Sequence, residues 1–192
     1  MTGPDNAEDA ADARLDSAVA RIDAGSPETC ASELGPLFEG APGFLARLCA
    51  ERPFCDARTL FATARTIART MPESDQLELI DAHPRLGAPP SAVSALSFVE
   101  QGYDLEVADR AAADAETDRQ RVADALVRLN AAYEAQFGFR YCVFVAGRSR
   151  EALLPGLEAA LTDDRASEID RALDAVVAIA EDRWAKRRGE VT

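Results

Sequence analysis

The sequence predicts an all-α fold, a single domain of about seven to eight helices with one irregular extended segment near residues 139–147. Three observations support this prediction. Apolar residues recur at helical spacings along most of the chain. Only residues 139–147, "FRYCVFVAG", have strong β propensity, and no partner strand is visible elsewhere. Hydrophobic residues make up 47% of the 192-residue chain, which is enough for a core.

Helical patterns begin near the N-terminus. Residues 7–25 favour a helix by propensity, and Gly25 stands where that helix would end. Its apolar positions are spaced by four and three residues: Leu15, Val19 and Ile22. The first ten residues are polar, so we expect residues 1–10 to be a disordered N-terminal end and residues 11–188 to form the domain.

Short helical pieces are expected in the next part of the chain. Glycine and proline interrupt residues 33–55, which favours brief helical turns that pack their aromatic side chains inward. A longer helix over residues 56–71 follows, with Asp56 as its candidate N-cap. Residues 72–83 form a second helix that opens on Pro72.

His83 is the only histidine in the chain, and it lies at the end of this second helix. Pro84 disfavours the α conformation at the residue before it, so the helix should end and His83 should adopt a more extended conformation. Residues 85–104 are rich in proline, glycine and serine and are expected to be a loop. Loops of this length in compact domains are usually functional or disordered.

The pattern of residues in the C-terminal half predicts three further helices. The longest covers roughly residues 106–136, and Gly138 is placed to cap it. Its buried stripe consists of Val122, Leu126, Leu129 and Tyr133. Residues 139–147 then form a buried extended segment or a short helix. A helix from Ser149 to about Leu161 contains Pro155 and should be kinked, and the last helix covers about residues 165–188.

Composition excludes several classes of function. A formal net charge of −13 disfavours nucleic acid and membrane partners. The four cysteines form no CxxC pair and follow no secretory segment, so free thiols in a cytoplasmic protein are expected. One histidine and scattered cysteines supply no usual metal site. GxGxxG, P-loop and GxSxG motifs are absent, and the only lysine, Lys186, lies near the C-terminus, which disfavours a Schiff base.

An enzyme with this composition is expected to be a cofactor-free acid–base catalyst built on His83, a carboxylate and arginines. The carboxylate candidate is Glu100, in the run "SFVEQG". On the residues alone, a histidine at a helix end is more often a surface or hydrogen-bonded core residue than a catalyst. Spacing alone slightly favours a solvent-exposed Glu100, because a charged group beside apolar neighbours is costly unless it is solvated or paired.

Five segments occur in one order: "GPLFEGAPGF", "ERPF", "LIDAHPRLG", "SALSFVEQ" and "LNAAYEAQFGFRYCVFVAG". Together they resemble the 2-oxo-4-hydroxy-4-carboxy-5-ureidoimidazoline (OHCU) decarboxylase family of urate degradation, over about residues 30–185. The resemblance implies an all-helical, cofactor-independent carboxy-lyase, commonly a homodimer. Its small-molecule substrate is decarboxylated to (S)-allantoin and CO2.

The resemblance also implies roles for individual residues. His83 and Glu100 match the catalytic histidine and glutamate of the family. The residues matching the substrate pocket and the segment that closes it are Pro84, Ser97, Gln101, Gly138 and Phe139.

Three features depart from the family pattern. Phe44 stands where tryptophan is frequent, and the stretch from His83 to Glu100 is a few residues shorter than in many members. Ala146 stands where many members have an active-site arginine. Arg148 or Arg140 could replace it as the group that binds the substrate carboxylate, and Arg148 is favoured.

Two alternatives to this function remain. A relative within the family could decarboxylate a different ureido or imidazoline carboxylate, since the missing arginine could mark a changed specificity. The chain could instead be a non-catalytic helical binding module. Such a module, however, has no need of both His83 and the spacing from Ser97 to Glu100 and Gln101.

Overall fold

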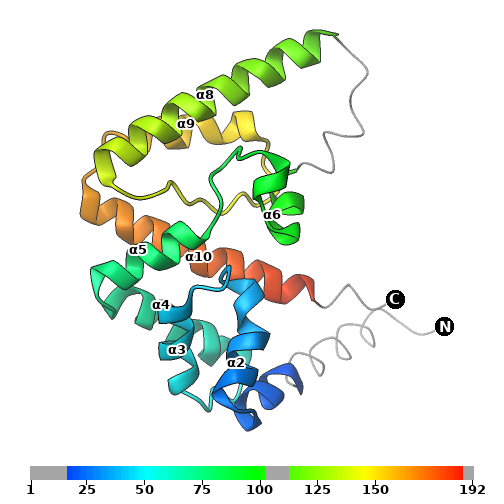
Figure 1. The fold of residues 1–192 in the computed structure, drawn as a ribbon, viewed down its shortest axis with the longest axis vertical. Coiled ribbons are helices and arrows are strands. Elements are labelled where there is room, and N and C mark those ends of the chain that lie inside the picture. Colours follow the sequence, from blue (N-terminus) through cyan, green and yellow to red (C-terminus); the bar gives the residue numbers. More distant parts are fainter. Residues whose placement is uncertain (1–16, 103–112, 188–192) are drawn as a thin grey trace, which may run out of the picture. The chain divides into compact units, whose positions relative to one another are not determined.

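The computed structural model describes residues 17–102 and 113–187, and it confirms the all-α prediction (Figure 1). No residue in these two ranges is in a β-strand. The chain divides into two compact units, one formed by residues 1–82 and 177–192 and the other by residues 83–176. The prediction for residues 1–10 falls outside the described residues. No helix within the described ranges is long and apolar enough to cross a membrane.

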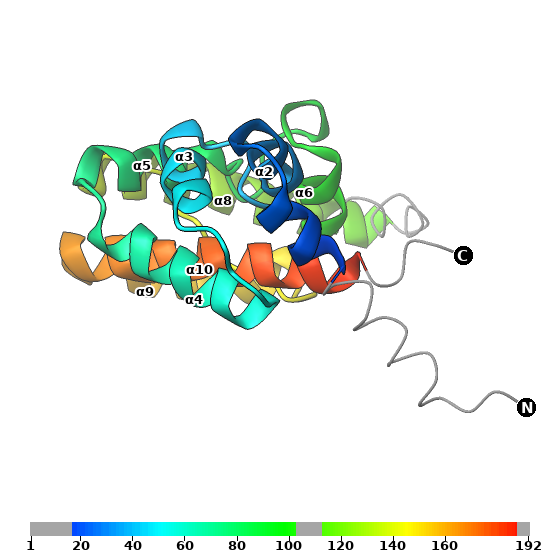
Figure 2. The same cartoon turned by 90° about the horizontal axis from the view of Figure 1, so that it is seen from below.

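The first unit is built around a short central helix. Its elements are a helical stretch at residues 17–24, α2 (Pro27–Leu34), η1 (Gly35–Leu37), α3 (Pro42–Ala50), α4 (Ala57–Thr70) and α5 (Glu73–Ala82). α3 packs against α2, α4 and α5, and Figure 2 shows it beside α2 and α5. Asp56 caps α4 as predicted, because its carboxylate accepts the Thr59 N–H at 2.7 Å.

The C-terminal part of α10 (Arg165–Lys186) completes this unit from Val177 onward. Arg183 is buried there and pairs with Glu39 at 2.7 Å. Its guanidinium also donates to the carbonyls of Pro36 and Leu37, both in η1. The buried Arg183 therefore provides hydrogen-bond donors for two backbone carbonyls of this turn.

The cysteines correct one prediction. Cys30 of α2 and Cys49 of α3 form a disulfide, with Cα atoms 5.9 Å apart, whereas free thiols were expected. Cys55 and Cys142 are free, as predicted. The two bonded residues are 19 apart in sequence, and only the packing of α2 on α3 brings them together. Sequence spacing alone carries no signal for such a pair.

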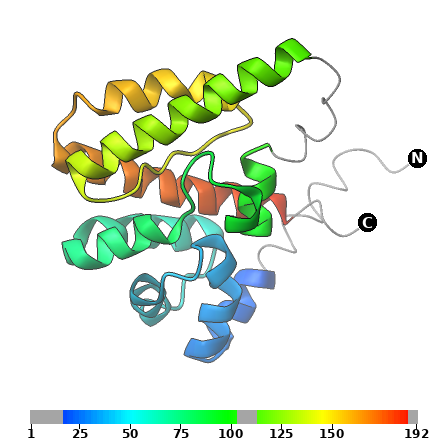
Figure 3. The same cartoon turned by 45° about the horizontal axis from the view of Figure 1, so that its top comes forward.

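The second unit contains η2 (Pro90–Ala92), α6 (Ala95–Glu100), α8 (Ala113–Phe137), α9 (Arg150–Ala160) and the first part of α10. α8 packs along α9 (Figure 3).

The prediction of a loop over residues 85–104 is partly wrong, because this stretch contains α6. Ser94 caps this helix by accepting the Ser97 N–H at 3.2 Å. Six residues are too few to display helical periodicity. The start expected for the longest helix, residues 106–112, lies outside the described residues.

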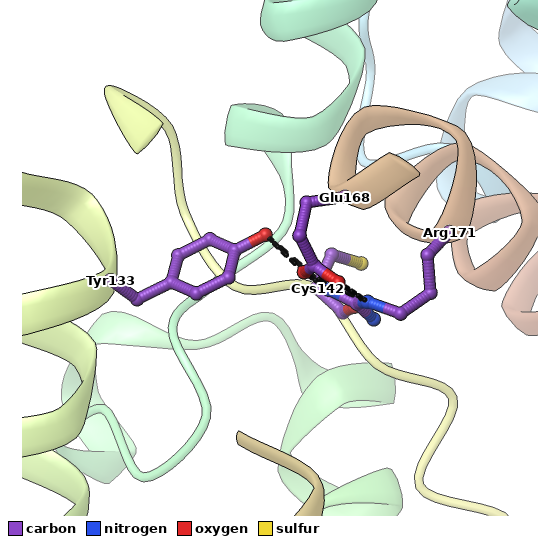
Figure 4. Close-up of polar contacts among 4 residues, drawn as sticks. All are labelled: Tyr133, Cys142, Glu168 and Arg171. Carbon is purple, nitrogen blue, oxygen red and sulfur yellow. Dashed lines mark hydrogen bonds and ion pairs between the residues drawn. The ribbon is translucent and has the colours of Figure 1, made fainter. Parts of the chain in front are cut away.

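Residues 139–147 form the expected irregular segment, without helix or strand. An ion pair on α10, between a half-buried arginine and a buried glutamate, anchors it (Figure 4). Arg171 donates from Nε and Nη2 to the Glu168 carboxylate at 2.8–2.9 Å, and from Nη1 to the carbonyl of Cys142 at 2.9 Å. The same guanidinium lies 4.5 Å from the centroid of the Tyr141 ring.

Tyr133 of α8 completes this cluster. Its hydroxyl donates to Glu168 at 2.7 Å, and the Glu168 side chain is only 1% exposed. Burial raises the pKa of the Tyr133 hydroxyl well above its ordinary range, and the hydrogen bond to Glu168 raises it further. Tyr133 therefore remains a protonated donor near neutral pH, and the carboxylate joins α8, α10 and the irregular segment.

Replacing Arg171 by methionine should lower the free energy of unfolding by about 3 kcal/mol, because the buried Glu168 carboxylate loses its cation. Urea unfolding followed by circular dichroism measures this change. Lys186→Ala is the matched control, since its ion pair with Asp182 on the same helix is exposed at the lysine. That variant should change stability by less than about 0.5 kcal/mol. Equal losses in the two variants would contradict the role of the buried pair.

Thiol titration tests the disulfide directly. Ellman's reagent should detect two thiols per denatured chain before reduction, since only Cys55 and Cys142 are free. A Cys30→Ser/Cys49→Ser double variant should lose about 3 kcal/mol of stability, because the unfolded chain is no longer cross-linked. Cys55→Ser, at an exposed free thiol, should leave the unfolding midpoint unchanged. Four reactive thiols in the unreduced protein would exclude the pairing.

Candidate active site

His83 lies directly after α5, which ends at Ala82 as the following Pro84 predicts. The histidine side chain is buried, with 4% of its surface exposed. Its carbonyl accepts a hydrogen bond from Nη1 of Arg140 at 3.2 Å. The only histidine of the chain is thus shielded from solvent, and its backbone is attached to the irregular segment.

Gln101 holds the residues that follow His83. Its side-chain oxygen accepts the Gly87 N–H at 2.8 Å, and its side-chain nitrogen donates to the Arg85 carbonyl at 3.3 Å. Gln101 is 8% exposed, at the C-terminal end of α6. The oxygen and the nitrogen of its side-chain amide are therefore both hydrogen-bonded to the backbone of the loop after His83. The family resemblance places Gln101 in the substrate pocket, and that role stays a prediction.

The other predicted residues of α6 differ in burial. Ser97 is buried and its backbone carbonyl accepts the Gln101 N–H at 3.0 Å. Glu100 is half-buried rather than fully exposed. Arg150, the first residue of α9, donates from Nη2 to the Gln101 carbonyl at 3.2 Å. Sequence reasoning missed Arg150, and its position two residues after Arg148 in "GRSR" was the only signal.

Gly138 and Phe139 lie at the start of the irregular segment. Gly138 is exposed and has φ +82°, as expected of a glycine that follows a helix end. Phe139 is 2% exposed, with its ring centroid 5.6 Å from that of Tyr133 and 6.1 Å from that of Phe137. The Phe139 ring thus belongs to the aromatic core of the second unit.

The two candidate arginines differ in their surroundings. Arg148 is exposed, and its guanidinium donates to the carbonyls of Phe144 and Val145 in its own loop. Arg140 is half-buried and donates to the carbonyl of His83. Ala146, at the position where an arginine was expected, is exposed with φ +51°. Of the two, the structure brings Arg140 to the histidine.

Across the described residues, no group of three or more acidic, histidine or cysteine side chains is placed to hold a metal ion. The residues described in this region include the buried His83 imidazole, the half-buried Glu100 carboxylate and the guanidinium groups of Arg140 and Arg150. Residues of these types can bind an anion and transfer a proton.

Comparison with known proteins identifies the family. The family model described as OHCU decarboxylase matches residues 23–185. The chain belongs to this family. The prediction of a carboxy-lyase of urate degradation is thereby confirmed.

Two curated relatives are similar to the chain. The 2-oxo-4-hydroxy-4-carboxy-5-ureidoimidazoline decarboxylase of Haloferax volcanii is 27% identical over 153 residues, which cover 80% of this chain and 85% of that protein. The uric acid degradation bifunctional protein PucL of Bacillus subtilis is 28% identical over 158 residues. The match covers 82% of this chain but only 30% of PucL.

Two solved structures share the fold. An OHCU decarboxylase crystallised in the presence of (S)-allantoin has a TM-score of 0.62 and 23% identity, and the match covers 86% of this chain and all of that one. An (S)-allantoin synthase has a TM-score of 0.59 and 20% identity, with 86% of this chain and 52% of that one covered. At these identities the likeness supports the fold alone.

Proposed function

We propose that this protein decarboxylates 2-oxo-4-hydroxy-4-carboxy-5-ureidoimidazoline to (S)-allantoin and CO2, the last step from urate to allantoin. The observation that carries the proposal is a buried His83, with its backbone held by Arg140, in a chain that matches the family over residues 23–185. As the family resemblance implies, the proposed enzyme is a cofactor-independent homodimer. Its cytoplasmic location is a prediction from the sequence alone, and the Cys30–Cys49 disulfide does not support it, because disulfides are rare in that compartment.

The proposed chemistry suits these side chains. The bond from the ring carbon to the carboxylate breaks, CO2 leaves, and the electron pair passes into the adjacent imine-like system. A proton then adds to one face of that carbon, which gives a single enantiomer. The enzyme needs to orient the carboxylate, limit its solvation and control the proton.

We assign His83 to the substrate hydroxyl, where it donates a hydrogen bond or transfers a proton. Glu100 orients His83 and the ureido group of the substrate. The burial of His83 supports this assignment, because a solvent-shielded imidazole transfers protons without competition from bulk water. Pro84 and Ser97 belong to the proposed pocket wall, as do Gly138 and Phe139.

The carboxylate needs a cation, and we favour Arg140 over Arg148 for this role. Arg140 is half-buried and already reaches the His83 backbone. Arg148 is exposed and occupied by the carbonyls of its own loop. A guanidinium in a less solvated position binds a carboxylate more strongly, because water competes less for it.

His83→Ala and Glu100→Gln should each abolish the enantioselective formation of allantoin while leaving the protein folded. Circular dichroism of allantoin, formed from urate by urate oxidase and hydroxyisourate hydrolase, measures the product, since the uncatalysed reaction gives a racemate. Glu158→Gln, at an exposed glutamate of α9, is the matched control and should behave as wild type. Racemic product from the wild-type protein would refute the proposed reaction. Activity only on related carboxy-ureido compounds would favour a family relative with another substrate.

Arg140→Ala should reduce kcat/KM by at least about tenfold, whereas Arg148→Ala should reduce it by less than about threefold. The physical reason is that Arg140 contacts the backbone of the proposed catalytic residue and Arg148 contacts only its own loop. Steady-state kinetics on freshly generated substrate measure both variants, and thermal unfolding checks that each is folded. A larger loss of kcat/KM in Arg148→Ala than in Arg140→Ala would indicate that Arg148 binds the substrate carboxylate.

A further inference from the structure

One face of α8 contacts the residues that follow His83. Leu126, Asn130 and Glu134 recur every four residues, so they lie on one side of this helix. We call these three residues the α8 stripe. Each contacts one residue of the stretch 85–87, which follows His83 by two positions.

The contacts run in opposite order along the two segments. Glu134 forms an ion pair with the side chain of Arg85. Asn130 donates from Nδ2 to the carbonyl of Leu86 at 3.0 Å.

The third contact involves Gly87, which has φ +77°. A Cβ atom built on this glycine would lie 2.8 Å from Cδ1 of Leu126. Glycine is therefore required twice here, for the left-handed conformation and for the close approach to α8. The three contacts fix the register of residues 85–87 on the stripe.

Asn130 is the central and most buried polar contact of the stripe, with 6% of its surface exposed. It satisfies a backbone carbonyl that no helix or strand pairs. Because Asn130 and Leu86 are both buried, water cannot easily replace the lost donor. Removing the amide would leave the Leu86 carbonyl unsatisfied and shift the loop from α8.

The position of residues 85–87 on α8 constrains the position of His83, because the two are joined by a single proline. Only Pro84 stands between His83 and Arg85, and its ring fixes φ and restricts the residue before it. Pro84 removes one of the few backbone rotations between the two segments and restricts another, which favours transfer of a displacement of residues 85–87 to His83.

We propose that Asn130 is a positioning residue for the decarboxylation, because its hydrogen bond to Leu86 fixes where His83 stands. Asn130 needs no contact with the substrate for this role. The inference rests on the proposed function for the identity of the reaction. It adds a residue of the "LNAAYEAQFGF" run whose amide acts on the site through the backbone.

The test compares Asn130→Leu with Gln136→Leu. Gln136 lies on the same helix and also donates from its side-chain amide to a backbone carbonyl, that of Leu161, at 3.0 Å. That bond is exposed and does not involve the His83 loop. Asn130→Leu should lower kcat by about tenfold or more with KM within about twofold, and should lower the enantiomeric excess of allantoin. Gln136→Leu should retain the kcat and the product stereochemistry of the wild type.

Asn130→Asp adds a pH readout that general loss of packing would not produce. A buried carboxyl group beside a carbonyl has a raised pKa, and only its protonated form can donate to Leu86. The kcat of this variant relative to wild type should therefore increase as the pH is lowered. A pH-independent ratio would contradict the hydrogen-bond role.

If Asn130→Leu does not fold, Glu134→Gln tests whether the contacts of the α8 stripe affect catalysis. Its partner Arg85 is half-exposed, so the loss of this ion pair should leave stability nearly unchanged. Its kcat should still fall by about twofold to fivefold, because the same loop is loosened. Wild-type kcat and stereochemistry in folded stripe variants would overturn the inference. Racemic product from the wild-type protein would instead refute the proposed function.

Discussion

The ion pair between the buried Glu168 and the half-buried Arg171 is the constraint on which the second unit depends. A carboxylate that is 1% exposed is stable only when it is paired and hydrogen-bonded, and Arg171 and Tyr133 meet both needs. Because the same arginine also donates to the Cys142 carbonyl, the pair holds a segment that has no regular structure of its own. That segment carries Arg140 to the backbone of His83.

The loop after His83 follows the same physical rule. Side chains bind several of its backbone groups, which no strand or helix pairs. The donors come from Gln101, Asn130 and Arg140, which belong to three different elements. An irregular backbone held in this way can place a side chain that a regular helix would orient differently. The positioning role proposed for Asn130 rests on this arrangement.

Much of the fold could be predicted because helical periodicity is a local signal. The boundaries of α4 and α10 and the end of α5 before Pro84 follow from caps, apolar spacing and proline geometry. α6 was missed because six residues do not complete two helical turns. At the site, the end of α5 before His83 was predictable from Pro84, whereas the hydrogen bonds from Gln101 to backbone groups were not.

The sequence by itself determined the all-α class, the departure of His83 from its helix and, through ordered motifs, the family. These features depend on residues close together in the chain, whose conformations are limited by local sterics and hydrogen bonding. Tertiary structure alone decided that Cys30 bonds Cys49, that Tyr133 reaches Glu168 and that Arg140 rather than Arg148 contacts His83. The physical reason is that packing between distant segments sets these distances, and no local pattern encodes them.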